Sequence, residues 1–232
     1  MGRDKALLPH PEGGSWLERT LRLLLDLQIP VTLLSRHERH LQMARALNRE
    51  WSGGGGTGSP RNDTTDAPGA LETLPGPAAA ATRQRDAGAE AGRPPITALA
   101  EEPPWEGPLL ALQRLMRRHP DERLLLCPVD MPDLNLAALE ALLAAAAQRP
   151  DRLHLAHDGE RLQPLLGVYP SVEPLRCELT EALQRGERRL QSWLATQPIQ
   201  AVRLDPDAIR NVNRPAEAAR ATSAAWNAQA AQ

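Results

Sequence analysis

The chain has 232 residues, a formal net charge of -2 and 3% aromatic residues, so Leu, Val and Ala must fill its core. This slightly acidic balance excludes a general nucleic-acid binder, which needs a basic surface. The two cysteines, Cys127 and Cys177, indicate a reducing compartment, and no apolar run is long enough to span a membrane. We therefore predict a cytoplasmic globular protein with one domain over residues 1–222 and a flexible tail over 223–232.

The first elements alternate between helix and strand. Ser15–Gln28 predicts a helix, since its leucines share one face and Ser15 can cap its first turn. Ile29–Leu34 is apolar and partly β-branched, which favours a strand, and Glu38–Asn48 again predicts a helix. This alternation with short joints is typical of a parallel α/β sheet.

Residues 52–94 interrupt that pattern. They contain runs of glycine and of alanine and almost no large apolar residues, so burial cannot offset the entropy of ordering them. We interpret them as a disordered insertion, because the pattern resumes with a strand at Ile96–Ala100 and a helix at Leu109–Arg118.

A short apolar strand followed by an acidic loop dominates the middle of the chain. Leu124–Leu126 predicts a strand buried on both faces in the middle of a parallel sheet, and Asp130 lies just past its carboxyl end. Open α/β sheets bind ligands at that edge. Asp130 is either a ligand-binding carboxylate or a cap for the helix expected at Leu134–Ala147, although Asp133 is better placed as the cap.

The last third contains a hairpin and a return to the alternating pattern. The Asp158-Gly159 turn between two apolar runs predicts an antiparallel strand on the sheet. The other elements expected are the strands Leu153–Ala156, Leu165–Tyr169 and Ile199–Leu204 and the helices Val172–Arg185 and Glu187–Ala195. A final helix is expected after Asn211–Pro215.

Polar residues follow three of the predicted strands, and one lysine opens the chain. Carboxylate and amide oxygens suit Mg²⁺, which takes few protein ligands, and a lysine suits a phosphate. Together at one edge of a sheet they predict a nucleotide-handling site. Its candidates are Lys5, Glu101, Glu102, Asp130, Asn211 and Asn213.

Several blocks resemble the nucleotidyltransferase superfamily, and within it the molybdenum cofactor guanylyltransferases. The first is Met1-Gly2-x-Asp4-Lys5-Ala6-Leu7, which resembles the end of the signature loop. The others occur in the family's order: Gly107–Leu109, Cys127–Pro132, His157–Arg161 with Gln163-Pro164, Gln184–Arg189 and Asn211–Pro215. The resemblance implies a Rossmann-like three-layer fold whose sheet is mostly parallel with one antiparallel strand.

The chain departs from the family pattern in two places. The family begins with a strand and a Gly-Gly-rich loop directly before the Met-Gly found here at Met1-Gly2, so the first strand is missing from this sequence. We expect an internal start, with roughly 15–20 residues upstream. The second departure is at Glu101 or Glu102, where the family more often has Asp, and either glutamate fits the alignment.

The resemblance implies transfer of GMP from GTP to molybdopterin, or Mo-molybdopterin, with release of pyrophosphate. It assigns Asp130 and Asn213 (or Asn211) to Mg²⁺ and Lys5 to the triphosphate. Glu101 or Glu102 would contact the nucleotide. Arg188 and Arg189 either clamp the phosphate of molybdopterin or form a solvated charge run. Proteins that mature molybdoenzymes are possible partners. The alternatives are a transferase that uses CTP or a sugar phosphate, and a non-catalytic truncated paralogue.

Overall fold

The structure is a computed structural model that describes residues 4–53 and 95–212. The final helix, the tail and the expected insertion lie outside these residues, except that Ser52 and Gly53 of the insertion belong to α2. The helices are η1 (Lys5–Leu7), α1 (Trp16–Asp26), α2 (Glu38–Gly53), α3 (Pro108–Arg118), α4 (Leu136–Gln148), α5 (Glu173–Gln184) and α6 (Leu190–Leu194). The strands are β1 (Val31–Ser35), β2 (Ile96–Ala100), β3 (Arg123–Leu126), β4 (Leu153–His157), β5 (Leu162–Pro170) and β6 (Ile199–Arg203).

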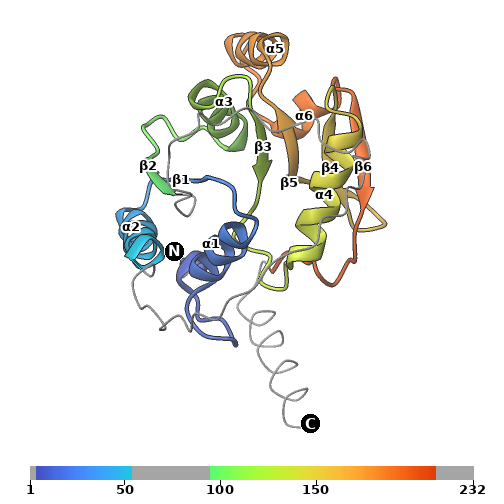
Figure 1. Cartoon of the computed structure of the whole chain (residues 1–232). Coiled ribbons are helices and arrows are strands. Elements are labelled where there is room, and N and C mark those ends of the chain that lie inside the picture. The colour runs from blue at the N-terminus through green and yellow to red at the C-terminus, as the bar shows by residue number, and fades with distance from the viewer. Residues whose placement is uncertain (1–3, 54–94, 213–232) are drawn as a thin grey trace, which may run out of the picture.

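The described strands form two sheets (Figure 1). In the first, β1 pairs in parallel with β2, and Val31 lies opposite Ile96. The second has the order β3-β5-β4-β6. There β5 is antiparallel to both of its neighbours, whereas β4 and β6 are parallel. The α/β class and the antiparallel strand expected from the Asp158-Gly159 turn are therefore confirmed.

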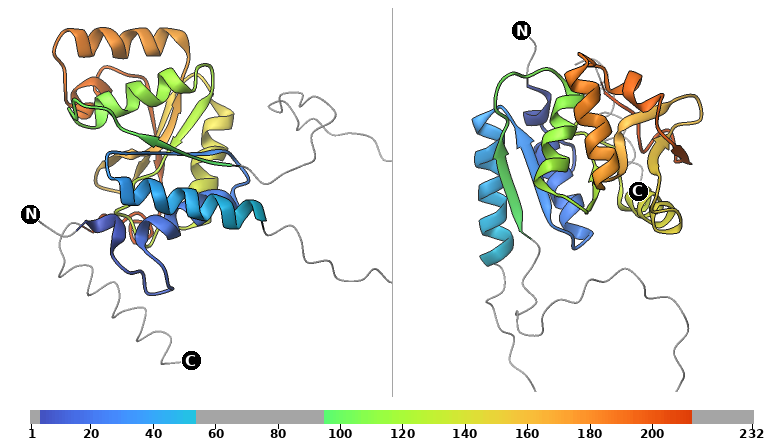
Figure 2. Two further views of the ribbon diagram at one scale, coloured as in Figure 1. Left: turned by 90° about the vertical axis from the view of Figure 1, so that its left-hand side faces the viewer. Right: turned by 90° about the horizontal axis from the view of Figure 1, so that it is seen from above.

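Helices cover both faces of the second sheet and so produce three layers. One face carries α3, α5 and α6, whose apolar residues pack against Leu153, Leu155 and Tyr169. The other face carries α4, which packs against residues of β5 such as Leu166 and Val168. This alternation follows from the strand period of two, which sends successive side chains to opposite faces. In Figure 2, α3 and α5 lie side by side on their shared face.

Helix α1 joins the two sheets. Ser15 caps it by accepting a hydrogen bond from the Glu18 amide at 3.2 Å, as the sequence predicts. Its residues Leu17, Leu21 and Leu25 are buried against α2, β1 and β2. Its other leucines, Leu23 and Leu24, and its C-cap residue Leu27 pack against the core that α4 shares with the second sheet. One amphipathic helix therefore holds the two sheets in a fixed position relative to each other.

A cavity of about 590 Å³ separates β1 from β3. It is lined by Val31 and Thr32 of β1 and by all of β3. Among the described residues, β1 pairs only with β2, and β3 pairs only with β5. The prediction that Leu124–Leu126 lies in the middle of a parallel sheet, buried on both faces, is therefore wrong: β3 is a half-buried edge strand with an antiparallel neighbour.

Several predicted boundaries, and the predicted cap of α4, differ from the structure. Strand β1 begins at Val31 rather than Ile29, because Gln28 has a positive φ of 56° and its amide still bonds to Leu25 of α1. Helix α2 extends to Gly53, past the predicted end at Asn48. The cap of α4 is Asn135, which accepts from the Ala138 amide at 3.0 Å, and not Asp133.

Candidate active site

The N-terminal turn positions the lysine. Asp4 precedes η1 and caps it by accepting a hydrogen bond from the Ala6 amide at 3.2 Å. Ala6 is buried against the core of the first sheet, which anchors the turn. The ammonium of Lys5 then donates to the carbonyl of Val212 at 3.2 Å. Residues from the two ends of the described chain therefore meet at this point.

The acidic loop after β3 lies against the same segment. The carbonyl of Asp130 accepts a hydrogen bond from the amide of Val212 at 2.9 Å. Its carboxylate is half-buried and makes no hydrogen bond or ion pair within the described residues. Because Asn135 caps the following helix, the capping alternative for Asp130 is excluded. The Asp130 carboxylate is therefore available to a ligand.

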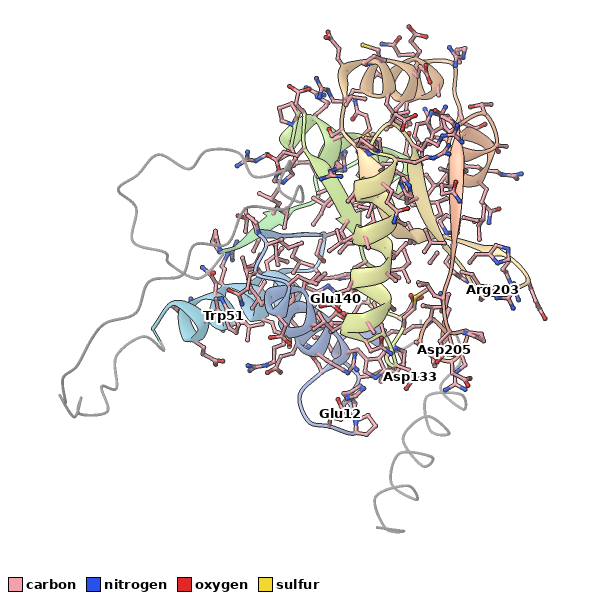
Figure 3. All side chains as sticks on the ribbon, turned by 45° about the vertical axis from the view of Figure 1, so that its right-hand side comes forward. Glu12, Trp51, Asp133, Glu140, Arg203 and Asp205 are labelled. Atoms are coloured by element: carbon pink, nitrogen blue, oxygen red, sulfur yellow. The ribbon has the colours of Figure 1, made fainter. Side chains whose placement is uncertain are left out.

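Further contacts hold the N-terminal loop against the loop after β3. The ring of His10 donates to the carbonyl of Pro132 at 3.2 Å, and burial lowers the pKa of His10 below its ordinary value. Arg19 of α1 donates to the carbonyl of Leu134 at 2.7 Å. Figure 3 shows Glu12, Asp133 and Asp205 gathered at this end of the molecule, on the loops that surround the site.

The segment after β6 completes the cluster. Val212 is buried, and its carbonyl bonds to Lys5 while its amide bonds to the Asp130 carbonyl. Asn211 beside it is exposed. Arg210 ties the segment to the loop after β3 through an ion pair with Asp133 at 2.9 Å. The structure thus brings together three of the predicted blocks, those of Lys5, Asp130 and Asn211. Asn213 lies outside the described residues.

The glutamates after β2 occupy a separate position. Glu101 continues the β1–β2 pairing, because its amide donates to the Ser35 carbonyl at 2.9 Å. Its carboxylate faces Arg114 of α3 at 3.5 Å. Glu102 is exposed, and no contact within the described residues joins either glutamate to Asp130. Of the two, Glu101 is the one that is fixed in place.

Arg188 and Arg189 follow α5 on the surface. The carboxylate of Glu187 accepts hydrogen bonds from both of their amides, which lowers the pKa of Glu187. The guanidinium of Arg188 pairs with Glu106 at 2.5 Å, next to the Gly107–Leu109 block. The guanidinium of Arg189 makes no hydrogen bond or ion pair within residues 4–53 and 95–212, although its charge helps to lower the pKa of Glu187.

Sequence reasoning missed the side chains that hold these loops. His40 of α2 bonds to Asp4 at 2.8 Å and to Ser35 at 2.9 Å. Neither His40 nor Ser35 belongs to a block that points to chemistry, because each owes its place to the packing of α2 on the sheet. The Asp158 turn is also structural: two backbone amides bond to its carboxylate and lower its pKa to about 2.

The oxygen ligands at this site suit a cation such as Mg²⁺ that is also coordinated by the phosphates of a substrate. No group of three or more His, Cys, Asp or Glu residues within the described residues is arranged to bind a metal. A single unengaged carboxylate beside an exposed amide nevertheless fits Mg²⁺, which is usually bound through one or two carboxylates together with phosphate and water. In the described part of the chain, no helix is both long and apolar enough to cross a bilayer.

A three-layer α/β fold with a lysine and a free carboxylate where the loops meet defines a nucleotide-handling protein. Residues 69–202, more than half of the chain, match the family of the MobA-like NTP transferase domain. The chain belongs to this family and is a nucleotidyltransferase.

Two relatives agree with that assignment, and a solved structure shares the fold. A probable molybdenum cofactor guanylyltransferase of Rhodopirellula baltica is 28% identical over 94% of this chain and 83% of its own length. The molybdenum cofactor guanylyltransferase of Ectopseudomonas mendocina is 32% identical over 50% of this chain, which spans 56% of that relative. Molybdopterin-guanine dinucleotide biosynthesis protein A of Archaeoglobus fulgidus shares the fold, with a TM-score of 0.55 over 97% of this chain and 92% of its own, at 13% identity.

Proposed function

We propose that this protein transfers GMP from GTP to molybdopterin, which yields molybdopterin guanine dinucleotide and pyrophosphate. The observation that carries the proposal is the meeting of Lys5 and Asp130 at Val212, where a positive charge and a free carboxylate lie on adjoining loops. The names of the relatives indicate the substrates, GTP and molybdopterin.

The reaction is a displacement at phosphorus. An oxygen of molybdopterin's terminal phosphate attacks the α-phosphorus of GTP, the bond to the bridging oxygen breaks, and pyrophosphate leaves. Such transfers depend on holding the two phosphates in line and on neutralising the charge that they share. Mg²⁺ would supply part of that neutralisation when bound, held by Asp130 with an amide oxygen of Asn211 or Asn213.

Lys5 would supply the other part at the triphosphate. It is the only lysine in the sequence and lies in a turn that its own cap stabilises. A lysine acts on a phosphate as a point charge, so its position matters more than its orientation. The bond to the Val212 carbonyl holds the ammonium beside the acidic loop, whose Asp130 carbonyl accepts from the Val212 amide.

The two glutamates would act on the nucleotide, and the two arginines would act on molybdopterin. Glu101, fixed at the end of β2, would contact the nucleotide, with Glu102 next to it. Arg189, whose guanidinium is exposed, would take the phosphate of molybdopterin. Arg188 would join it only by leaving Glu106. Cytoplasmic location and contact with molybdoenzyme-maturation proteins follow from the same proposal.

The test is product formation from defined substrates. The chain is incubated with Mg²⁺, molybdopterin and GTP, and pyrophosphate and the guanine dinucleotide are measured by mass spectrometry. Parallel arms replace GTP by CTP, replace molybdopterin by a sugar 1-phosphate, or remove the metal with EDTA. We expect product only with GTP, molybdopterin and metal, and at least about 100-fold less with Lys5→Met. Equal use of CTP would contradict the assignment of the base.

A further inference from the structure

We propose that His40 is a positioning residue for the nucleotide site, acting through Asp4 on Lys5. The inference rests on the proposed function only in its last step, the binding of a triphosphate. His40 is 7% exposed and lies on α2, one element away from the site. It touches neither Lys5 nor Asp130 in any contact that the structure gives.

The Asp4 carboxylate fixes the direction of the hydrogen bond at Nε2 of His40, and the direction at Nδ1 depends on the tautomer of the ring. The carboxylate of Asp4 only accepts, so the Nε2–H of His40 donates to it at 2.8 Å. With one proton on the ring, Nδ1 accepts from the hydroxyl of Ser35 at 2.9 Å. The Ser35 oxygen in turn accepts from the amide of His37 at 3.2 Å. We call this chain of hydrogen bonds from Ser35 through His40 to Asp4 the relay. Each ring nitrogen, hydroxyl and carboxylate oxygen in it has a hydrogen-bond partner, and the His40 ring fits in one orientation.

The relay fixes the turn that carries the lysine. One oxygen of Asp4 caps η1 through the Ala6 amide, and the other takes the bond from His40. Asp4 is thus held on two sides, by its own turn and by His40 of α2, whose ring is in turn bonded to Ser35 at the end of β1. Lys5 follows directly, so its backbone has little freedom and its ammonium stays near Val212.

The same three residue types form hydrolase triads, but the arrangement here is different. In a triad, Nε2 faces the serine and Nδ1 faces the carboxylate, and the serine oxygen is open to the substrate. Here the ring is reversed, Ser35 is 8% exposed and its oxygen already bonds to the His37 amide. The geometry points to orientation of a turn and not to nucleophilic attack.

The single lysine makes a direct test possible. Acylation of the full chain by a water-soluble N-hydroxysuccinimide ester reports on Lys5 and the N-terminal amine alone, and mass spectrometry separates the two. His40→Leu removes the donor to Asp4, so we expect Lys5 to be acylated roughly threefold faster or more. His40→Gln can still donate and should stay within about twofold of the parent, as should the control Arg39→Ala, an exposed residue of the same helix.

A double-mutant cycle on Mg-GTP binding separates positioning from general damage. We expect His40→Leu to weaken binding roughly tenfold in the parent and to have no effect in a Lys5→Met background. An unchanged acylation rate in His40→Leu, or equal weakening in both backgrounds, would overturn the proposal. If His40→Leu does not fold, Asp4→Ala in the exposed turn breaks the same contact. Since acylation needs no nucleotide, that arm decides the matter even if no variant binds GTP.

Discussion

Asp130 and Asp133 lie three positions apart in one loop, yet only Asp133 has an ion-pair partner among the described residues. A polar group that is partly buried and unpaired is unfavourable for the fold. Asp130 is such a group, which explains why the loop presents its carboxylate to a ligand. Asp133, engaged with Arg210, contributes to the surface of the same loop.

We expect Asp130→Ala to lower the rate of GMP transfer at least about 100-fold, because charge at the α-phosphate would no longer be neutralised. The free energy of unfolding should change by less than about 0.5 kcal/mol, since the side chain has no partner to lose. Pyrophosphate release and urea unfolding measure the two quantities. The matched control Asp133→Ala breaks an exposed ion pair, so it should cost at most about 1 kcal/mol and leave transfer within a few-fold. Unfolding of Asp130→Ala would support a structural role instead.

His154 makes stability depend on pH. It is completely buried in β4, its Nε2 has no partner in the described residues, and burial lowers its pKa from the ordinary value of 6.5. The unfolded chain therefore binds the proton more readily than the folded one. Stability is fully present above pH 6.5 and is lost as the pH falls toward the folded-state pKa.

We expect His154→Leu to weaken the loss of stability between pH 7.5 and pH 5.5, which urea titrations at both values would measure. His10, whose pKa is lowered in the same direction, should leave part of the dependence in place. An exposed histidine, His37, serves as the control through His37→Leu. An identical pH dependence in the parent and in His154→Leu would show that this ring does not titrate on unfolding.

At the scale of elements, most of the fold followed from local patterns. The cap at Ser15, the Asp158-Gly159 turn and the exact bounds of β2 were predictable because each depends on neighbouring residues. The place of β3 was not, because an apolar run of three leucines does not say which strands flank it. Lys5 and Asp130 of the site were predictable from their residue types and their places after a loop and a strand. The contacts of Val212, His40 and Ser35 were not, because they exist only in the folded chain.

Gly167 of β5 is the described glycine with the least space for a side chain. A Cβ at this position would lie 2.4 Å from the carbonyl oxygen of His154 and 3.2 Å from the Cα of Leu155. Because backbone atoms cannot move aside as a side chain does, we expect Gly167→Ala to destabilise the fold by about 3 kcal/mol. Thermal unfolding measures this. Leu165→Ala on the same strand, where the side chain is 43% exposed, should cost less than about 1 kcal/mol.

At the scale of the whole molecule, the cavity between β1 and β3 is the main irregularity. Both strands face it with edges that have no partner among the described residues, and unpaired ladder groups favour the addition of a further strand. One extended segment in this cavity could pair with both edges.

We expect the 232-residue chain to bind Mg-GTP weakly, since open edges next to the site leave its loops less constrained. Isothermal titration calorimetry with Mg-GTP measures the affinity of the chain. Micromolar or tighter binding would show that the open edges have no bearing on the nucleotide site.

The short connection between β4 and the antiparallel strand β5 also determines the order in which the strand pairs form during folding. Only residues 158–161 separate it from β4, whereas residues 36–95 separate β1 from its partner β2. Closing a loop roughly fifteen times longer costs about 2 kcal/mol more in chain entropy. The β4–β5 hairpin can therefore form early and act as a template for β3 and β6, while β1 and β2 find each other late. In a folding experiment, the half that carries Lys5 would be the last to acquire its structure, and the nucleotide site would appear only at the end.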